Sequence, residues 1–235
     1  MKELRKFIPA LLVAVGLLAL GLCIQSGLNS ISANKRTVAV RGLAEREVMA
    51  DRVTWPIVYK LVGNDLPRLY DQISENNSKI TCFLLDNGIA QEEISITAPG
   101  IYDQQAERYS QKENVYRYIV TGEVIVTSDK IEKVNDLIMR QAELMKVGIS
   151  LSNEDYQYQT KYEFLGLNEI KPEMIEEATH NARQAANKFA EDSQSKLGKI
   201  INATQGQFTI NDRDNYTPWI KEVRVVTYID FALDD

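Results

Sequence analysis

Histidine is almost absent from this sequence, since His180 is the only one among 235 residues. The chain also contains no H-E-x-x-H, G-x-S-x-G, G-x-x-x-x-G-K-[ST] or G-x-G-x-x-G motif. A histidine-based metal site or catalytic triad would have to be assembled around His180 alone. We therefore expect no catalytic residue, no metal ligand and no cofactor, and we predict that the protein is not an enzyme.

Cysteine is nearly as scarce, because only Cys23 and Cys82 occur and neither belongs to a C-x-x-C motif. Cys23 lies in an apolar N-terminal run and Cys82 in a predicted helix, so we expect no disulfide between them. Two interpretations of Cys82 remain. It could be a redox-sensing thiol, or a small buried hydrophobic residue, and its neighbours Phe83 and Leu84 favour burial.

The sequence has no basic stripe, and its formal net charge is −6. A protein of this charge repels a phosphate backbone, so nucleic acid is excluded as an expected partner.

Two acidic residues, Asp212 and Asp214 in "NDRDNY", begin like a calcium-binding loop. The glycine at the turn and the final bidentate glutamate of such a loop are missing at the required offsets. The segment is therefore predicted to be a solvated hairpin loop.

The N-terminus contains the longest apolar run, which covers residues 7–24 and includes Phe7, Leu12, Leu18 and Ile24. As a helix, these 18 residues would reach about 27 Å, enough to cross a hydrocarbon core. The basic residues before the run favour a cytoplasmic N-terminus. We expect residues 1–28 to form a single-pass anchor in the inner membrane, 29–36 a linker, and 37–235 a periplasmic domain.

A cleaved signal peptide is the alternative to an anchor, with cleavage after Ala33 in "SISA". A lipoprotein attached through Cys23 is disfavoured, because bulky Leu22 occupies a position that requires a small residue.

The remaining pattern predicts an α+β fold, with about three helices packed on a largely antiparallel sheet in the order ββ-α-ββ-α-β-α-ββ. Asn64 or Asp65 as N-cap, Pro67 in the first turn and Gly88 as the stop mark the bounds of the first of these helices. The expected strands cover 37–48, 52–62, 92–100, 115–127, 155–164, 199–209 and 222–233, and the helices 65–87, 130–147 and 172–197.

Small residues dominate one face of the third helix, which is predicted to end at Gly198. A helical wheel places Ile175, Ala178, Ala182, Ala185, Phe189 and Ser193 on one stripe. We expect this stripe, with Ala178, Ala182, Ala185 and Phe189 at its centre, to pack closely against a sheet or a neighbouring subunit. His180 falls on the opposite side and is predicted to be exposed.

Tyrosines alternate with polar residues in "DYQYQTKYEF", a pattern typical of a strand with one wet face. Tyr156, Tyr158 and Tyr162 would then share a face. That face could bind a sugar or another ring-shaped ligand, although packing under a helix is the commoner use of such residues.

Several segments resemble the SIMPL-domain family. They are "VAVRGLAEREVMAD", "DNGIAQEEI", "YRYIVTGEVIVT", "EEATHNARQAANKFAEDSQSKLGKI" and "KEVRVVTYIDFAL", and the resemblance covers about residues 37–233. It implies an α+β fold, an envelope location, assembly into rings in some members and a link to oxidative-stress defence. A Gly-Tyr common in the family before the central strand is replaced here by "YRY", and the family offers no catalytic residues to transfer.

Three functions remain open at this point. The leading hypothesis is a membrane-tethered, non-enzymatic scaffold of the cell envelope, which forms homo-oligomers or binds an envelope protein. The second is a periplasmic small-molecule binding module, using the tyrosine-bearing strand or the loop at 104–113. The third is an enzyme or redox sensor that uses His180 or Cys82.

Overall fold

The computed structural model describes residues 16–18, 20–25, 36–106, 116–152 and 158–234. Residues 16–18 and 20–25 are helical, and Leu18 and Ile24 are exposed there. Phe7 and Leu12 lie outside the described residues, as does Ala33. Within the described ranges, no helix is long and apolar enough to span a membrane.

The chain divides into two compact units. Unit 1 comprises residues 1–43, 177–206 and 226–235, and unit 2 comprises residues 44–176 and 207–225. Strands β1 (Thr37–Met49) and β9 (Ile220–Asp234) and helix α5 (Leu167–Asp192) contribute residues to both units.

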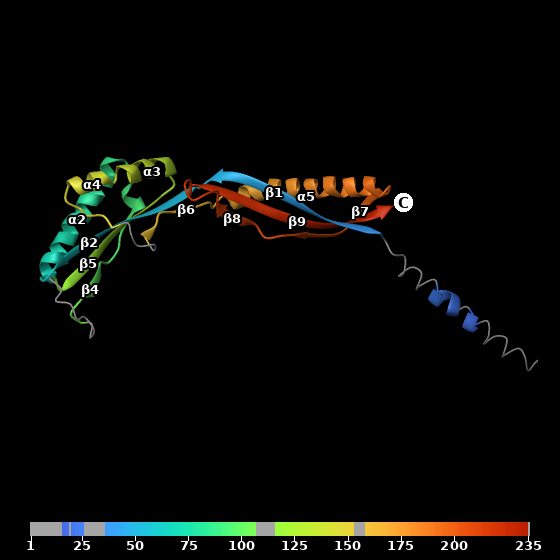
Figure 1. Ribbon diagram of the computed structural model, residues 1–235, viewed down its shortest axis with the longest axis horizontal. Helices are drawn as coiled ribbons and strands as arrows, with labels where there is room; N and C mark the ends of the chain where they lie inside the picture. Colours follow the sequence, from blue (N-terminus) through green and yellow to red (C-terminus); the bar gives the residue numbers. More distant parts are fainter. Residues whose placement is uncertain (1–15, 19, 26–35, 107–115, 153–157, 235) are drawn as a thin grey trace, which may run out of the picture. The chain divides into compact units, whose positions relative to one another are not determined.

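Unit 2 contains a five-stranded antiparallel sheet (Figure 1). Strand β2 (Arg52–Gly63) pairs along its length with β5 (Tyr118–Ser128). Two short strands, β3 (Ile94–Ile96) and β4 (Gly100–Asp103), pair with β5, and β6 (Lys161–Glu163) pairs with the start of β2. Because β6 reaches only Thr54, Pro56 costs the sheet no ladder hydrogen bond with β6.

Helices cover the sheet of unit 2, and their apolar faces form its core. They are α2 (Leu66–Asp86), α3 (Ile131–Arg140) and α4 (Ala142–Lys146). The short 3-10 helix η1 (Gln91–Glu93) has no buried residue. Helix α2 begins as predicted, since the Asp65 side chain accepts a hydrogen bond from the Arg68 backbone at 3.4 Å. Gly88 ends it with a φ of 79°.

A buried tyrosine joins the sheet of unit 2 to α2. The Tyr59 hydroxyl donates to the Ile73 carbonyl at 3.0 Å and contacts the Asn77 amide oxygen at 2.7 Å. Burial raises the pKa of Tyr59 to about 12. A Cβ at Gly122 would lie 2.4 Å from the Tyr59 ring, so only glycine leaves room for this ring beneath β5.

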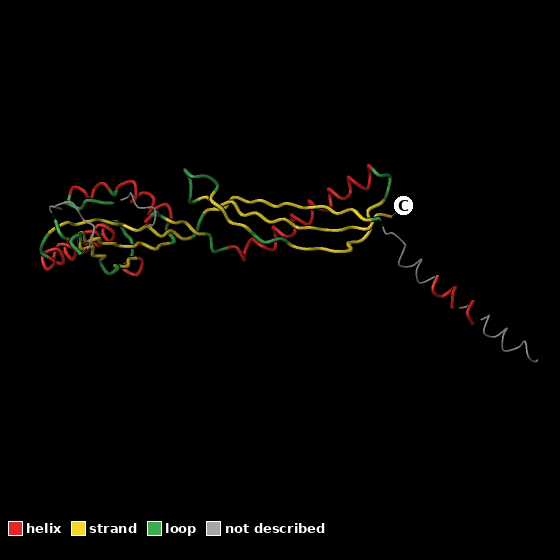
Figure 2. Tube along the Cα trace, turned by 60° about the horizontal axis from the view of Figure 1, so that its bottom comes forward, coloured by secondary structure: helices red, strands yellow, loops and turns green. Residues whose placement is uncertain are grey.

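Unit 1 contains a sheet with the strand order β1-β9-β7, where β7 is Lys196–Gln205. Helix α5 runs alongside these long strands in both views (Figures 1 and 2), and its residues from Glu177 onward belong to unit 1. The core is small and consists of Val40, Ala182, Ala186, Ile229 and Phe231. A fourth strand, β8 (Thr209–Asp212), pairs with the part of β9 that belongs to unit 2.

The α5 backbone approaches β1 closely in unit 1. A Cβ on Gly42 would lie 1.8 Å from the Ala178 carbonyl oxygen. The fully buried positions of the helix recur every four residues, at Met174, Ala178, Ala182, Ala186 and Ala190. Small side chains are therefore required along this line, as the alanine pattern predicted for Ala178 and Ala182.

Phe189 does not pack against the sheet of its own chain, because 60% of this residue is exposed, so of the two expected partners of the stripe the sheet is ruled out for Phe189. Ala185 is only partly buried and packs at the margin of the small core. The contact line steps by four residues rather than alternating three and four, and it has no space for an aromatic ring where two backbones meet. Phe189 therefore lies outside the helix–sheet contact.

Other differences from the predicted order have local causes. The α+β class and the antiparallel pairing are confirmed, but the strands form two sheets, and the described residues from 36 onward form four α-helices. The helix expected at 130–147 divides at Gln141 into α3 and α4. Helix α5 begins at Leu167, before Pro172, because the Asp51 carboxylate accepts hydrogen bonds from the Leu165 and Gly166 backbone amides.

The end of α5 was also predicted wrongly. The helix stops at Asp192, Gln194 adopts a φ of 56°, and β7 starts at Lys196. Gly198 thus lies within a strand, where a Cβ would come within 3.0 Å of the Ala232 side chain. The expected helix stop is instead a glycine that permits close packing inside the sheet.

Candidate binding cleft

A cleft of about 390 Å³ lies in unit 2 beside the β8–β9 hairpin. One wall comes from the segment around β6 and the other from the hairpin. The lining residues are Gln159, Thr160, Lys161, Tyr162, Glu163, Asp212, Pro218 and Lys221. This volume falls near the lower end of the range for ligand pockets, which is about 300–1,000 Å³.

Tyr162 is the predicted site tyrosine that the cleft contains. Its hydroxyl donates to the Asn135 amide oxygen at 2.5 Å, and its ring packs edge-on against Trp219 with a centroid distance of 6.1 Å. Burial raises the pKa of Tyr162. The ring is thereby fixed in one orientation and presents part of its surface to the cleft.

Lys221 is the least exposed charged group in the cleft, with an exposed fraction of 6%. It is the cross-strand partner of Asp212, and its ammonium donates a hydrogen bond to the Asp212 carboxylate. Only half of the Asp212 side chain is buried. A buried ammonium needs such a partner, since removal of a charge from water without compensation is expensive.

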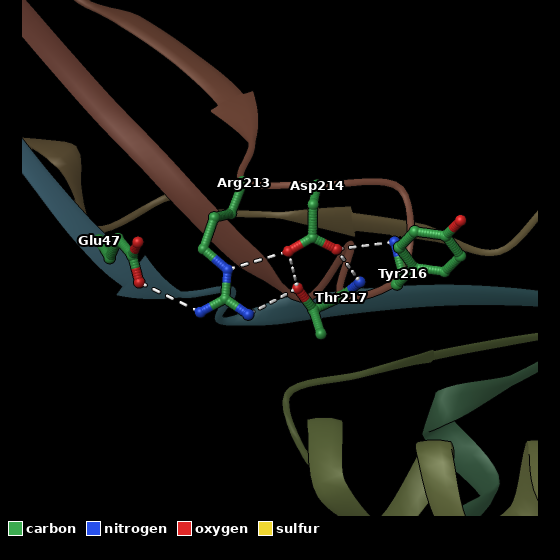
Figure 3. Close-up of polar contacts among 5 residues, drawn as sticks. All are labelled: Glu47, Arg213, Asp214, Tyr216 and Thr217. Carbon is green, nitrogen blue, oxygen red and sulfur yellow. Dashed lines mark hydrogen bonds and ion pairs between the residues drawn. The ribbon is translucent and has the colours of Figure 1, made fainter.

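The loop that joins β8 to β9 is held by Asp214 (Figure 3). Its carboxylate accepts hydrogen bonds from the Tyr216 and Thr217 backbone amides, both at 2.7 Å, and from the Thr217 hydroxyl at 2.5 Å. Arg213 donates to Asp214 at 3.0 Å and to Glu47 at 3.2 Å. The Thr217 hydroxyl and the Arg213 guanidinium hold the pKa of Asp214 well below its usual range.

This network decides the role of the two aspartates considered for calcium. Asp214 uses both carboxylate oxygens within its own loop, and Asp212 pairs with Lys221. The predicted hairpin is confirmed by the pairing of β8 with β9. Tyr216 projects from the fixed loop with 89% exposure, and Pro218 from the same loop lines the cleft.

Of the other predicted tyrosines, the structure describes Tyr158, and this residue does not share a strand with Tyr162. Tyr158 has helical rather than extended backbone geometry and is half-buried, and of the expected strand the described residues 158–164 form only β6. Tyr156 lies outside the described residues. Of the alternative loop at 104–113, the structure describes only Gln104 to Ala106, which form a turn after β4.

Neither His180 nor Cys82 is among the described residues that line this cleft. His180 is exposed, as predicted, and its Nε2 atom contacts the Gln184 amide nitrogen at 2.8 Å. The prediction that Cys82 is buried is wrong, because this thiol is exposed. Cys82 points away from the α2 core positions, into a groove of about 620 Å³ that also includes Phe83, Leu144 and Lys146.

Sequence reasoning missed Lys221, although the pattern contains a signal for it. In "KEVRVV", Lys221 occupies the same alternating register as Val223 and Val225, which are both buried. A lysine in the apolar register of a strand implies a buried ammonium that requires a partner. That its partner is Asp212 of β8 depends on the register between β8 and β9, which the alternating pattern alone does not determine.

Comparison with known families was decisive for classification. The SIMPL family model, described as a protein of unknown function (DUF541), matches residues 38–222. The chain belongs to the SIMPL family. This confirms the predicted resemblance, and the matched region of this SIMPL protein includes all residues that line the cleft. A search of curated proteins gives no match.

Proposed function

We propose that this SIMPL protein is a non-enzymatic scaffold of the cell envelope that assembles with further copies of itself. In this proposal, residues 1–28 anchor the chain in the inner membrane, and the remaining chain lies in the periplasm. There it would bind envelope proteins and take part in defence against oxidative stress, which is the process that the family resemblance suggests.

The observation that carries the proposal is the outer face of the unit 1 sheet. Along β1, Val40 and Gly42 are buried towards α5, whereas Arg41 and Leu43 are exposed on the other face. Tyr228 of β9 is also exposed, and the Arg41 guanidinium lies 5.1 Å from the centre of its ring. A sheet face with exposed Leu and Tyr side chains favours association.

The outer strands of this sheet add a second favourable feature. Strands β1 and β7 lie at the two ends of the order β1-β9-β7. Residues Lys199 to Gln205 of β7 are exposed, including Ile200 and Ile201. Strands at the end of a sheet are templates for pairing with another chain, so a second copy is the occupant that we assign to this surface.

Sedimentation of the full chain in detergent tests the scaffold proposal. The unaltered protein should sediment as an oligomer, and Tyr228→Glu combined with Ile201→Lys should reduce its mass towards that of one chain. Phe189→Lys is the matched control, because Phe189 is an exposed apolar residue on the helix rather than the sheet. A strict monomer that captures no envelope protein would contradict the proposal.

A second function, binding of a small molecule, is favoured by the cleft at Tyr162 and Lys221. The cleft combines an oriented aromatic ring with a buried charged group, which is the usual composition of a ligand pocket. A screen of ring-containing compounds should find one that raises the melting temperature of the full chain. Replacement of Tyr162 by Ala, at a fold verified by circular dichroism, should remove that increase.

A further inference from the structure

The Lys221 ammonium has more hydrogen-bond donors than the structure uses. An ammonium carries three N–H donors. Among the described residues, Asp212 is the one hydrogen-bond partner found for this group. Only 8% of the Lys221 side chain is exposed, yet it lines the cleft. An acceptor group that enters the cleft could therefore accept hydrogen bonds from the N–H groups of Lys221 that Asp212 does not use.

The other residues of the cleft indicate which kind of ligand group would bind to Lys221. Lys161 contributes a second positive charge, and Asp212 is already engaged by Lys221. The Tyr162 hydroxyl is directed to Asn135, so the ring rather than the hydroxyl is available to a ligand. Together with Pro218, this ring supplies an apolar surface.

We propose that the cleft binds a small organic acid with a ring or another compact apolar body. Its carboxylate accepts hydrogen bonds from Lys221 and attracts Lys161, and its body lies against Tyr162 and Pro218. This inference rests on the small-molecule function proposed above and names the class of ligand. An amine of the same shape would meet two ammonium groups, and the carboxylates among the described lining residues are Asp212, which is engaged by Lys221, and Glu163.

Asp212 offsets the positive charge that a ligand carboxylate would meet at Lys221, so loss of the Asp212 charge should tighten binding rather than weaken it. Removal of its charge by Asp212→Asn frees the ammonium without disturbing the shape of the cleft. Binding of an acid should then become tighter, about tenfold if one charge-assisted hydrogen bond is gained.

Four probes separate the carboxylate from the ring. Isothermal titration of the full chain in detergent would use benzoate, benzyl alcohol, benzylammonium and inorganic phosphate. We expect benzoate to bind, benzyl alcohol and benzylammonium to bind at least about tenfold more weakly, and phosphate, which lacks an apolar body, to bind more weakly than benzoate. Equal binding of benzyl alcohol and benzoate would overturn the inference but preserve the small-molecule function.

Two lysine variants test whether the benzoate carboxylate binds to Lys221. Lys221→Met should weaken benzoate binding at least about tenfold, whereas Lys188→Met should leave it unchanged. Lys188 is 70% exposed and is not among the described lining residues, so no effect on binding is expected there. Both variants remove one positive charge, which makes Lys188→Met a matched control. Unchanged benzoate binding by Lys221→Met would overturn the inference.

Asp212→Asn and Lys161→Gln keep the test decisive if Lys221→Met does not fold. The first should tighten benzoate binding and the second should weaken it, and the opposite pair of results would overturn the inference. If none of the four probes binds and the screen of ring compounds is also negative, both the ligand class and the small-molecule function fail. The scaffold proposal is independent of that outcome, because it rests on sedimentation.

Discussion

The two units are stabilised internally by different kinds of packing. In unit 2, nineteen buried residues, mostly Val, Ile and Leu, join three helices to a sheet. In unit 1, the core cluster of described residues has five members, and alanines bring the α5 backbone against β1 at Gly42. The core of unit 2 thus depends on large apolar side chains that fill the space between the helices and the sheet. Unit 1 depends on small side chains that let α5 approach β1 closely.

The largest effect is expected from removal of volume in unit 2. Leu84 of α2 is completely buried, so Leu84→Ala should lower the free energy of unfolding by about 2–5 kcal/mol. Urea unfolding can be followed by tryptophan fluorescence, because both tryptophans, Trp55 and Trp219, belong to unit 2. Leu85→Ala is the control at a neighbouring exposed position, and an equal loss there would contradict the comparison.

Addition of volume should be the change that damages unit 1. Ala182 is fully buried on the contact line of α5, so Ala182→Leu should force α5 away from the sheet and cost about 1–3 kcal/mol. Faster hydrogen exchange of the amides from Glu177 to Asp192 would report the loss. Asn187→Leu, at an exposed position of the same helix, should have little effect. Unchanged exchange in Ala182→Leu would refute the close-packing argument.

A smaller, pH-dependent effect is expected at Glu93 in unit 2. Burial raises the pKa of this carboxyl, but hydrogen bonds from Lys130, the Ala90 amide and Ser128 outweigh it and lower the pKa from 4.5 to about 2. Since the folded pKa is the lower one, ionised Glu93 stabilises the fold above pH 4.5, and this contribution is lost as the pH falls from 4.5 towards 2.

The variant Glu93→Gln should flatten this pH dependence. Its melting temperature should fall less than that of the unaltered protein between pH 4.5 and the acid limit of the measurement. Glu92→Gln, which replaces the exposed neighbour, is the control. Parallel curves for Glu93→Gln and the unaltered protein would show that the hydrogen-bonded carboxylate does not contribute.

The smallest effects are expected at the two residues that first suggest an enzyme. His180 and Cys82 are exposed, so His180→Ala and Cys82→Ser should each change the free energy of unfolding by less than about 0.5 kcal/mol. If the protein is a scaffold, neither variant should alter the peroxide survival of a deletion strain in which it is reintroduced. A lost phenotype with Cys82→Ser alone would favour the redox-sensor hypothesis.

Local signals in the sequence were sufficient wherever chain neighbours determine the structure. Asp65, Pro67 and Gly88 marked the bounds of α2, and the strands expected at 37–48 and 222–233 agree with β1 and β9. The same reasoning failed at Pro172 and Gly198. Their usual meaning as helix boundaries was overridden by Asp51, distant in sequence, and by packing against Ala232.

The sequence by itself determined the family, the α+β class and the exposure of His180, because these depend on composition, order and periodicity. The tertiary structure decided which face of α5 is buried, that Cys82 is exposed, and that Lys221 meets Asp212 beside Tyr162. Each of these depends on strand register or on a backbone distance between segments far apart in the chain. Periodicity assigns a residue to one face of a helix or strand, but tertiary packing determines which residues that face contacts.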